Sequence, residues 1–461
     1  MDAKQERMRV LSEEKVSTAL LKLGLPAIIG MLISALYNVV DAYFISWLGS
    51  SQMAAVSIVF PVVMVVIGLG LTYGIGAGSC ISRYIGGGNM TGANKTASSA
   101  MFSGVIAGIV ITAASFFFME DILVYLGASE TILPYAKKYF SVYMLFSTVS
   151  ICYITINSII ISEGASRMSM LVMLFGGILN IVLDPIFIFV FRLGVSGAAI
   201  ATAISQISML AIFIWYFASA KTNVKIAFGH VSFEKRIQLD ILKIGLQMFA
   251  FQLLSGLSMG MTNTAVSQYG DAAVASVGVA LRILALASFV IFGFVKGFQP
   301  IVGYSYGAAD YGRLKQCTRT ALQWTFAYCA IVTMALCFFN QEIMVLFSHG
   351  DATIVHIGGK VLMYNGLVFI LFGLFMVYST IFLALGKGLE GMVLNMSRQG
   401  IFFIPAILIL PRIFGMNGVI YAQPVAETLS FILVVLLFVP LKKSLNGLAM
   451  KTAELASEHG M

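Results

Sequence analysis

Charged residues are scarce in this sequence: Asp, Glu, Lys and Arg make up only 10% of its 461 residues, whereas 59% are hydrophobic. Soluble globular proteins carry about 25% charged residues, which cover their water-exposed surface. This chain has too few charges to cover such a surface. The composition therefore excludes a soluble enzyme, a nucleic-acid-binding protein and a disordered protein, and it indicates a polytopic membrane protein.

Metal-ligating and disulfide-forming residues are also few. The five cysteines lie in apolar stretches without CxxC spacing, and the four histidines form no HExxH pair. No combination of a nucleophile and a base suggests a catalytic site. We therefore expect neither an enzyme nor a bound cofactor.

Long apolar runs dominate the sequence instead. A helix that crosses a bilayer needs about 20 mainly apolar residues. Breaks at Gly, Pro, Asn and charge clusters delimit twelve candidate spans: 18–47, 53–81, 95–118, 134–162, 168–191, 196–218, 240–269, 274–299, 317–339, 358–385, 391–411 and 416–440. The sequence thus predicts an all-α membrane protein with twelve transmembrane helices in two pseudo-symmetric six-helix lobes.

The positive charges predict the orientation of these spans. With the N-terminus inside, 21 of the 28 Lys and Arg residues fall on the cytoplasmic side and five on the outer side. The inner count includes Arg398, although this residue lies within the predicted span 391–411. The positive-inside rule then predicts a multi-pass protein of the plasma membrane with both termini in the cytoplasm. The net charge of +8 is explained by topology, so nucleic acid is not an expected partner.

The two halves of the chain are related by an offset of 221 residues. LLKLGLP at 20–26 matches ILKIGLQ at 241–247, and six of the twenty glycines in the first half meet a glycine at this offset, where chance gives about two. Six spans per half make the repeats parallel, an arrangement found in transporters. We expect an N-lobe at 1–218, a cytoplasmic linker at 219–239 and a C-lobe at 240–461, with a short amphipathic helix at the start of each half.

Two carboxylates lie deep within predicted spans. Asp41 is in the first span and Asp184 in the fifth, where each costs about 2.5–3.5 kcal/mol on insertion scales. The matching positions in the other half are Thr262 and Pro405. A purely architectural role would have been kept in both copies, so this asymmetry favours a functional role.

Other polar residues are spaced to accompany these acids. Asn180 precedes Asp184 by one helical turn, and Pro185 cannot donate to the carbonyl oxygen of Ile181. Tyr37 and Asn38 precede Asp41 by one turn, and the sixth span supplies Thr202 and Gln206. Carboxylate, amide and hydroxyl oxygens suit Na⁺, but the same acids can take up protons. The sequence leaves both coupling ions open.

The second half carries cations in its spans. Arg282 and Lys296 are 14 residues apart in the eighth span and share a helix face. Lys296 either extends to the cytoplasmic surface or lies in a cavity. Glu427 in the last span either pairs with one of these cations or forms a second coupling site.

Taken together, these stretches resemble the multidrug and toxic compound extrusion (MATE) family, in its bacterial multidrug-exporter branch, over nearly the full chain. The resemblance is carried by LPAIIGMLISALYNVVDAYFISWLG at 25–49, ILNIVLDPIFIF at 178–189, GFQPIVGYSYGA at 297–308 and YAQPVAE at 421–427. It implies two six-helix lobes and the export of organic cations in exchange for H⁺ or Na⁺. It also implies a cation site at Asp41, Asn180, Asp184 and Thr202, and substrate contacts at Tyr37, Asn157, Met173 and Asn180.

Two departures from the family pattern bear on function. The seventh and tenth spans offer only Gln247, Gln252 and Asn365 where some members carry acids, so coupling is expected in the N-lobe. Lys296 replaces an expected neutral residue, which conflicts with a purely cationic substrate range.

We therefore predict a monomeric antiporter that exports an amphipathic small molecule by alternating access within membrane lipid. A lipid-linked oligosaccharide flippase of related fold is the alternative. The residues predicted to line the substrate cavity are Tyr37, Asn38, Asn157, Met173, Gln206, Gln252, Arg282, Lys296 and Glu427.

Overall fold

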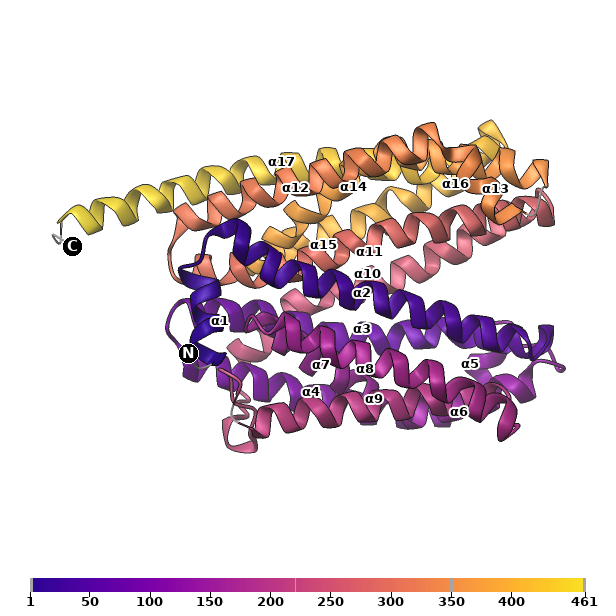
Figure 1. Cartoon of the computed structure of the whole chain (residues 1–461), viewed down its shortest axis with the longest axis horizontal. Helices are drawn as coiled ribbons and strands as arrows, with labels where there is room; N and C mark the ends of the chain where they lie inside the picture. Colours follow the sequence, from indigo (N-terminus) through magenta and orange to yellow (C-terminus); the bar gives the residue numbers. More distant parts are fainter. Residues whose placement is uncertain (1–2, 220, 349–350, 459–461) are drawn as a thin grey trace.

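The computed structural model describes residues 3–219, 221–348 and 351–458, which form a bundle of long helices (Figure 1). The N-half contains α1 (Ala3–Ser12), α2 (Val16–Ser46), α3 (Ser50–Gly86), α4 (Met90–Phe117), α5 (Met119–Tyr125), α6 (Leu133–Leu145), α7 (Ser147–Ser162), α8 (Ser166–Pro185), the π-helix Ile186–Val190 and α9 (Val195–Ala218). The C-half contains α10 (Lys235–Ser267), α11 (Asp271–Gly307), α12 (Tyr311–Phe338), α13 (Asn340–Ser348), α14 (Ala352–Ala384), α15 (Gly388–Met396), the π-helix Ser397–Ile401, α16 (Phe403–Phe414) and α17 (Met416–Glu458).

The predicted spans agree with these helices. Within the described residues, eleven helical segments are long and apolar enough to cross a membrane, and α6 and α7, which are bent by 49° where they meet, make a twelfth if the pair is counted as one span. The fifth span continues past Pro185 as a π-helix. Proline has no N–H to donate, which leaves a carbonyl oxygen of the preceding turn free and favours such a local change of winding. The all-helical fold class is confirmed.

The repeat is visible in the backbone. Gly49 and Gly270 precede α3 and α11 with φ angles of 98° and 91°. Gly194 and Gly415 precede the sixth span of each half with φ/ψ of 57°/−136° and 58°/−137°. These left-handed conformations require glycine. The same turns therefore recur at the same positions of both halves.

The two halves contact each other through paired helices, α3 with α10 and α2 with α11 (Figure 1). A Cβ atom on Gly76 would overlap the Ile241 carbonyl oxygen, and one on Gly297 would meet the backbone of Gly24. Gly86 lies equally close to the Tyr304 carbonyl oxygen. Backbone thus packs directly on backbone toward the end of the molecule that holds α1, which we call the inner end.

The linker differs from its prediction. A short helix precedes the first span, but residues 221–234 follow an irregular path with a 3₁₀ turn at Phe228–His230. Side chains of the N-half bind the backbone N–H groups of the linker in place of helical partners. Glu163 accepts from Asn223 and Val224, Asn94 accepts from Lys225, and Ser99 accepts from Ser232. The expectation of a helix at the start of the second half is therefore wrong.

At the inner end, α1 is held by a residue of the C-half. Arg313, at the start of α12, donates to the carbonyl oxygens of Leu11, Glu14 and Val10 at 3.0, 2.7 and 3.0 Å. These carbonyls lie at and just beyond the last turn of α1, where intrahelical partners are missing. Arg313 therefore fixes the first helix of the N-half to the C-half.

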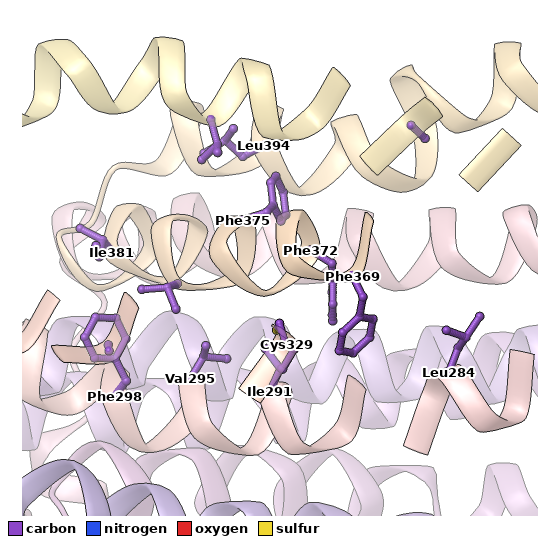
Figure 2. Close-up of a cluster of buried hydrophobic side chains, with 14 of the residues drawn as sticks. Leu284, Ile291, Val295, Phe298, Cys329, Phe369, Phe372, Phe375, Ile381 and Leu394 are labelled. Carbon is purple, nitrogen blue, oxygen red and sulfur yellow. The ribbon is translucent and has the colours of Figure 1, made fainter. Parts of the chain in front are cut away.

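The largest hydrophobic core is formed mainly by the C-half helices α11, α12, α14, α16 and α17, and it extends to α1 and the start of α2. Figure 2 shows its part between α11, α12, α14 and α15. Phe298 and Phe375 are almost completely buried in it. This core keeps the C-half helices in fixed register, so that the polar groups described below hold defined positions.

Candidate functional site

A cluster of polar side chains lies within the N-half, on α8 and α9. Asp184 is completely buried and Asn180 is 3% exposed. The Asn180 amide nitrogen lies 3.3 Å from Asp184 Oδ1 and 3.5 Å from Thr202 Oγ1. The i,i+4 spacing on α8 brings the amide and the carboxylate together, and the packing of α9 on α8 adds the hydroxyl.

Asp41 faces this cluster from α2. Its carboxylate lies within electrostatic range of Asp184, because α2 packs along α8, where Ile33 and Tyr37 contact Gly177. In the part of the chain that the structure describes, Asp41 Oδ1, Asp184 Oδ2 and Asn180 Oδ1 are buried without a hydrogen-bond donor. Buried acceptors without partners are costly, so this arrangement suits a proton or a small cation that would satisfy them.

Sequence reasoning missed two tyrosines beside these acids. Tyr139 and Tyr143 lie one turn apart on α6, with their rings stacked and the ring centroids 6.3 Å apart. Both side chains are at least nine-tenths buried. Tyr139 is within electrostatic range of both Asp41 and Asp184. The only available signal was the pair of aromatic hydroxyls at i,i+4 spacing in an otherwise apolar span.

Several predicted cavity residues lie inside the N-half instead of between the halves. Asn157 Oδ1 accepts a hydrogen bond from Ser169 at 2.6 Å, Met173 packs close to Gly30, and Gln206 accepts from Ser150. Asn38 is exposed, and its amide donates to the Ser34 carbonyl oxygen of its own helix at 2.6 Å.

Two other predicted residues lie at the boundary between the halves. The Gln252 amide nitrogen on α10 lies 2.8 Å from Met64 Sδ on α3. Lys296 Nζ on α11 lies 3.3 Å from Met31 Sδ on α2. Each polar group thus reaches from the C-half to a thioether of the N-half.

The other residues of the C-half that were predicted to line the substrate cavity lie apart from one another. Arg282 is exposed on α11. Glu427 on α17 forms an ion pair with Arg398 and not with either predicted cation, and the two side chains are 5% and 12% exposed. Gln423 donates to the same Glu427 oxygen at 2.9 Å, and the Arg398 guanidinium lies 4.4 Å from the Phe372 ring centroid.

Arg398 has to be removed from the count of inner charges, because it lies within a span, as the predicted bounds 391–411 already imply. It lies in the π-helix Ser397–Ile401, inside the span Gly388–Phe414, and not in an inner loop. The charge is tolerated there because Glu427 and the Phe372 ring compensate it. The compensating groups are 29 and 26 positions away in the sequence, so the apolar pattern around Arg398 could not reveal them.

The structure therefore brings together Asp41, Asn180, Asp184 and Thr202 in one place, whereas Arg282, Lys296 and Glu427 lie in three different environments. The described residues contain no group of three or more His, Cys, Asp or Glu side chains that could hold a metal ion. Two acids with an amide and a hydroxyl are a ligand set for a proton or an alkali cation.

Comparison with known proteins adds independent findings. The family described as MatE matches residues 26–186 and 245–409, one segment in each half. The multidrug export protein MepA of Staphylococcus aureus is 30% identical over 453 residues, which cover 98% of this chain and 99% of that protein. MepA of Staphylococcus saprophyticus is 29% identical over 430 residues, which cover 92% and 94% of the two chains.

Solved structures match over a similar extent. A crystal structure of MATE in complex with MaL6 has a TM-score of 0.89 and 26% identity, covering 95% of this chain and 98% of its own. A multidrug resistance MATE family transporter of the MOP superfamily in its outward-facing conformation has a TM-score of 0.88 and 27% identity, with the same coverage. The segment 26–186 matched by the family includes Asp41, Asn180 and Asp184.

Proposed function

This chain belongs to the MatE family of transporters, and from that premise we propose that it exports amphipathic, mostly cationic organic molecules in exchange for H⁺ or Na⁺. Membership makes it a multi-pass membrane transporter and not an enzyme. The observation that carries the proposed coupling is the group of three buried oxygens without donors, contributed by Asp41, Asn180 and Asp184.

Helix α2 connects the coupling site to the interface between the halves. In its outer part, Ile33 and Tyr37 contact α8 beside the acids, and in its inner part Gly24 and Ile28 contact α11. Pro26 lies in the inner part and lacks the N–H that would complete the helix, which makes this a natural bending point. Binding of an ion at Asp41 can therefore change how α2 packs against the C-half.

The transport cycle follows from two states with different affinities. In the outward-facing state, Asp41 and Asp184 take up the ion, and the resulting change in α2 lowers the affinity for the substrate. In the inward-facing state the ion leaves, and the charged carboxylates again favour a cationic substrate. Each ligand shifts the equilibrium only by its differential affinity for the two states.

We also propose that the described conformation is outward-facing and that the inner end lies in the cytoplasm. The glycine contacts between the halves concentrate toward the inner end. Helix α1 and the end of α17 lie at this same end (Figure 1). The excess of positive charge in the connections supports this orientation.

The coupling ion can be determined with purified protein in liposomes. Export of an ethidium-type dye is measured under an imposed pH gradient and, separately, under an imposed Na⁺ gradient. We expect one of the two gradients to drive export. Absence of export under both gradients would contradict the proposed antiport.

A further inference from the structure

We propose that Lys296 binds an anionic group of the substrate, a carboxylate or phosphate, in the cavity between the two halves, so that the exported molecules include zwitterions. This inference rests on the proposed function and narrows its substrate class. It starts from the position of Lys296. The residue lines a cavity of about 20 Å³ together with Ser158 and Ser162 of α7, Gly78 of α3, and Gln299 of α11.

The ammonium group of Lys296 lacks an acidic partner. None of the ion pairs found among the described residues includes it. Its polar contact is Met31 Sδ at 3.3 Å, and a thioether is only a weak acceptor for a group with three donors. A charged amine within a span normally has a compensating partner or faces a substrate path.

Lys296 also lies far from the inner end of its helix. It lies eleven residues before Gly307, the last residue of α11, which corresponds to about 16 Å along the axis. A lysine side chain is much shorter than this distance. The ammonium group of Lys296 therefore does not reach the inner end of α11, and it lies beside the cavity lined by Ser158, Ser162 and Gln299.

The other cation buried in a C-half span shows what a structural role requires. Arg398 has Glu427 as its ion partner and the Phe372 ring beside its guanidinium. Lys296 has neither kind of partner within the described residues. The contrast indicates that the compensating charge for Lys296 comes from a bound molecule.

The walls of the cavity explain why such binding would depend on the state of the transporter. Helices α3 and α7 belong to the N-half and α11 to the C-half, so separation of the halves at the inner end would open the cavity. In the conformation described, about 20 Å³ holds only one water-sized group. An anionic group would thus bind Lys296 when the inner end is open and lose its place when the halves close. Gln299, one turn further along α11, offers an amide donor on the same face.

The inference is tested by binding to the full-length protein in phosphatidylcholine nanodiscs, measured by fluorescence anisotropy. The probes are a rhodamine dye with a free carboxylate and the methyl ester of the same dye, which differ only in the anionic group. We expect wild type to bind the carboxylate dye more tightly than the ester. The variant Lys296→Met should weaken carboxylate binding about tenfold, as expected for loss of a charge-assisted hydrogen bond, and leave ester binding within about twofold.

The variant Lys296→Arg keeps the charge and should keep the preference for the carboxylate. The inference is overturned if wild type shows no such preference, or if Lys296→Met weakens the binding of both dyes equally. It is also overturned if phosphatidylglycerol displaces the carboxylate dye from wild type but not from Lys296→Met. That result would assign Lys296 to a lipid headgroup. The binding assay needs no ion gradient, so its outcome is separate from that of the export assay.

Discussion

At the scale of single residues, the buried carboxyl group of Glu163 is compensated by neighbouring donors and has a shifted pKa. Glu163 lies just beyond the inner end of α7 and is completely buried. Its Oε2 atom accepts hydrogen bonds from the backbone N–H groups of Asn223 and Val224 at 2.8 and 3.2 Å. Burial raises the pKa of this carboxyl from 4.5 to about 7, although nearby Arg7 and the two N–H groups act in the opposite direction.

The raised pKa of Glu163 predicts a pH dependence of stability. A folded-state pKa above the ordinary value means that folding favours the protonated form. This stabilising contribution is complete below pH 4.5 and is lost as pH rises through about 7. At roughly 1.4 kcal/mol per pKa unit, the effect amounts to a few kcal/mol.

Thermal unfolding of the purified protein, measured on both sides of this pH window, checks the prediction. Wild type should lose stability toward alkaline pH, and Glu163→Gln, which stays neutral and can still accept both hydrogen bonds, should lose less. Glu13→Gln changes an exposed glutamate and serves as the control. Equal pH dependence of wild type and Glu163→Gln would refute the assignment.

The ion pair between Arg398 and Glu427 gives a second prediction at this scale. Removing one partner of a buried pair leaves an uncompensated charge and costs roughly 3–5 kcal/mol. Arg398→Met and Glu427→Met should therefore each destabilise the protein, and the double variant should recover most of the loss. Thermal unfolding of the three variants forms a double-mutant cycle. Additive losses in the double variant would show that the two residues do not stabilise each other.

At the scale of helices, the contacts of α3 and α11 at the inner end determine how closely the halves approach. The Cβ atom of an alanine at position 86 would overlap the Tyr304 carbonyl oxygen of the other half. A Cβ atom at Gly260 on α10 would meet no neighbouring residue within 4 Å. Comparison of alanine variants at these two positions therefore distinguishes the effect of closer packing between the halves from the general effect of alanine on a helix.

We expect Gly86→Ala to separate the halves at the inner end and to increase the inward-open population, whereas Gly260→Ala should not. Spin labels at Thr91 and Gln316, which are exposed near the starts of α4 and α12, report this distance by pulsed electron paramagnetic resonance. The labels are introduced into a background without native cysteines. An unchanged distance distribution in Gly86→Ala would show that this contact does not control closure.

The sequence predicts helices better than it predicts connections. All twelve spans follow from apolar runs, because a bilayer requires long segments with internally satisfied backbone groups. The linker was predicted less well, because the partners of its N–H groups, such as Glu163 and Ser99, lie far away in the sequence. The same reason explains why Arg398 was counted with the inner charges, since its partner Glu427 is also distant in the sequence. Asp41 and Asp184 were found because a carboxylate in a span is costly wherever its partners lie.

At the scale of the whole molecule, two similar halves differ in their polar interiors. Thr262 and Gln423 are the counterparts of Asp41 and Thr202 at the 221-residue offset. With Asn365 they line a cavity of about 40 Å³ in the C-half. Its polar side chains are neutral, so it lacks the carboxylates that would take up a coupling ion. This difference supports the proposal that coupling takes place in the N-half.

The proposed transport cycle requires the acids of the N-half to couple an ion to export. Gradient-driven efflux of an ethidium-type dye from proteoliposomes tests it most directly, with Asp41→Asn and Asp184→Asn compared against Asp271→Asn, an exposed acid at the start of α11. We expect each variant in the site to lower gradient-driven efflux by about tenfold or more, since a loss of 1.4 kcal/mol already gives a factor of ten. We expect Asp271→Asn to transport like wild type. Efflux at the wild-type rate by both Asp41→Asn and Asp184→Asn would contradict the proposed transport cycle.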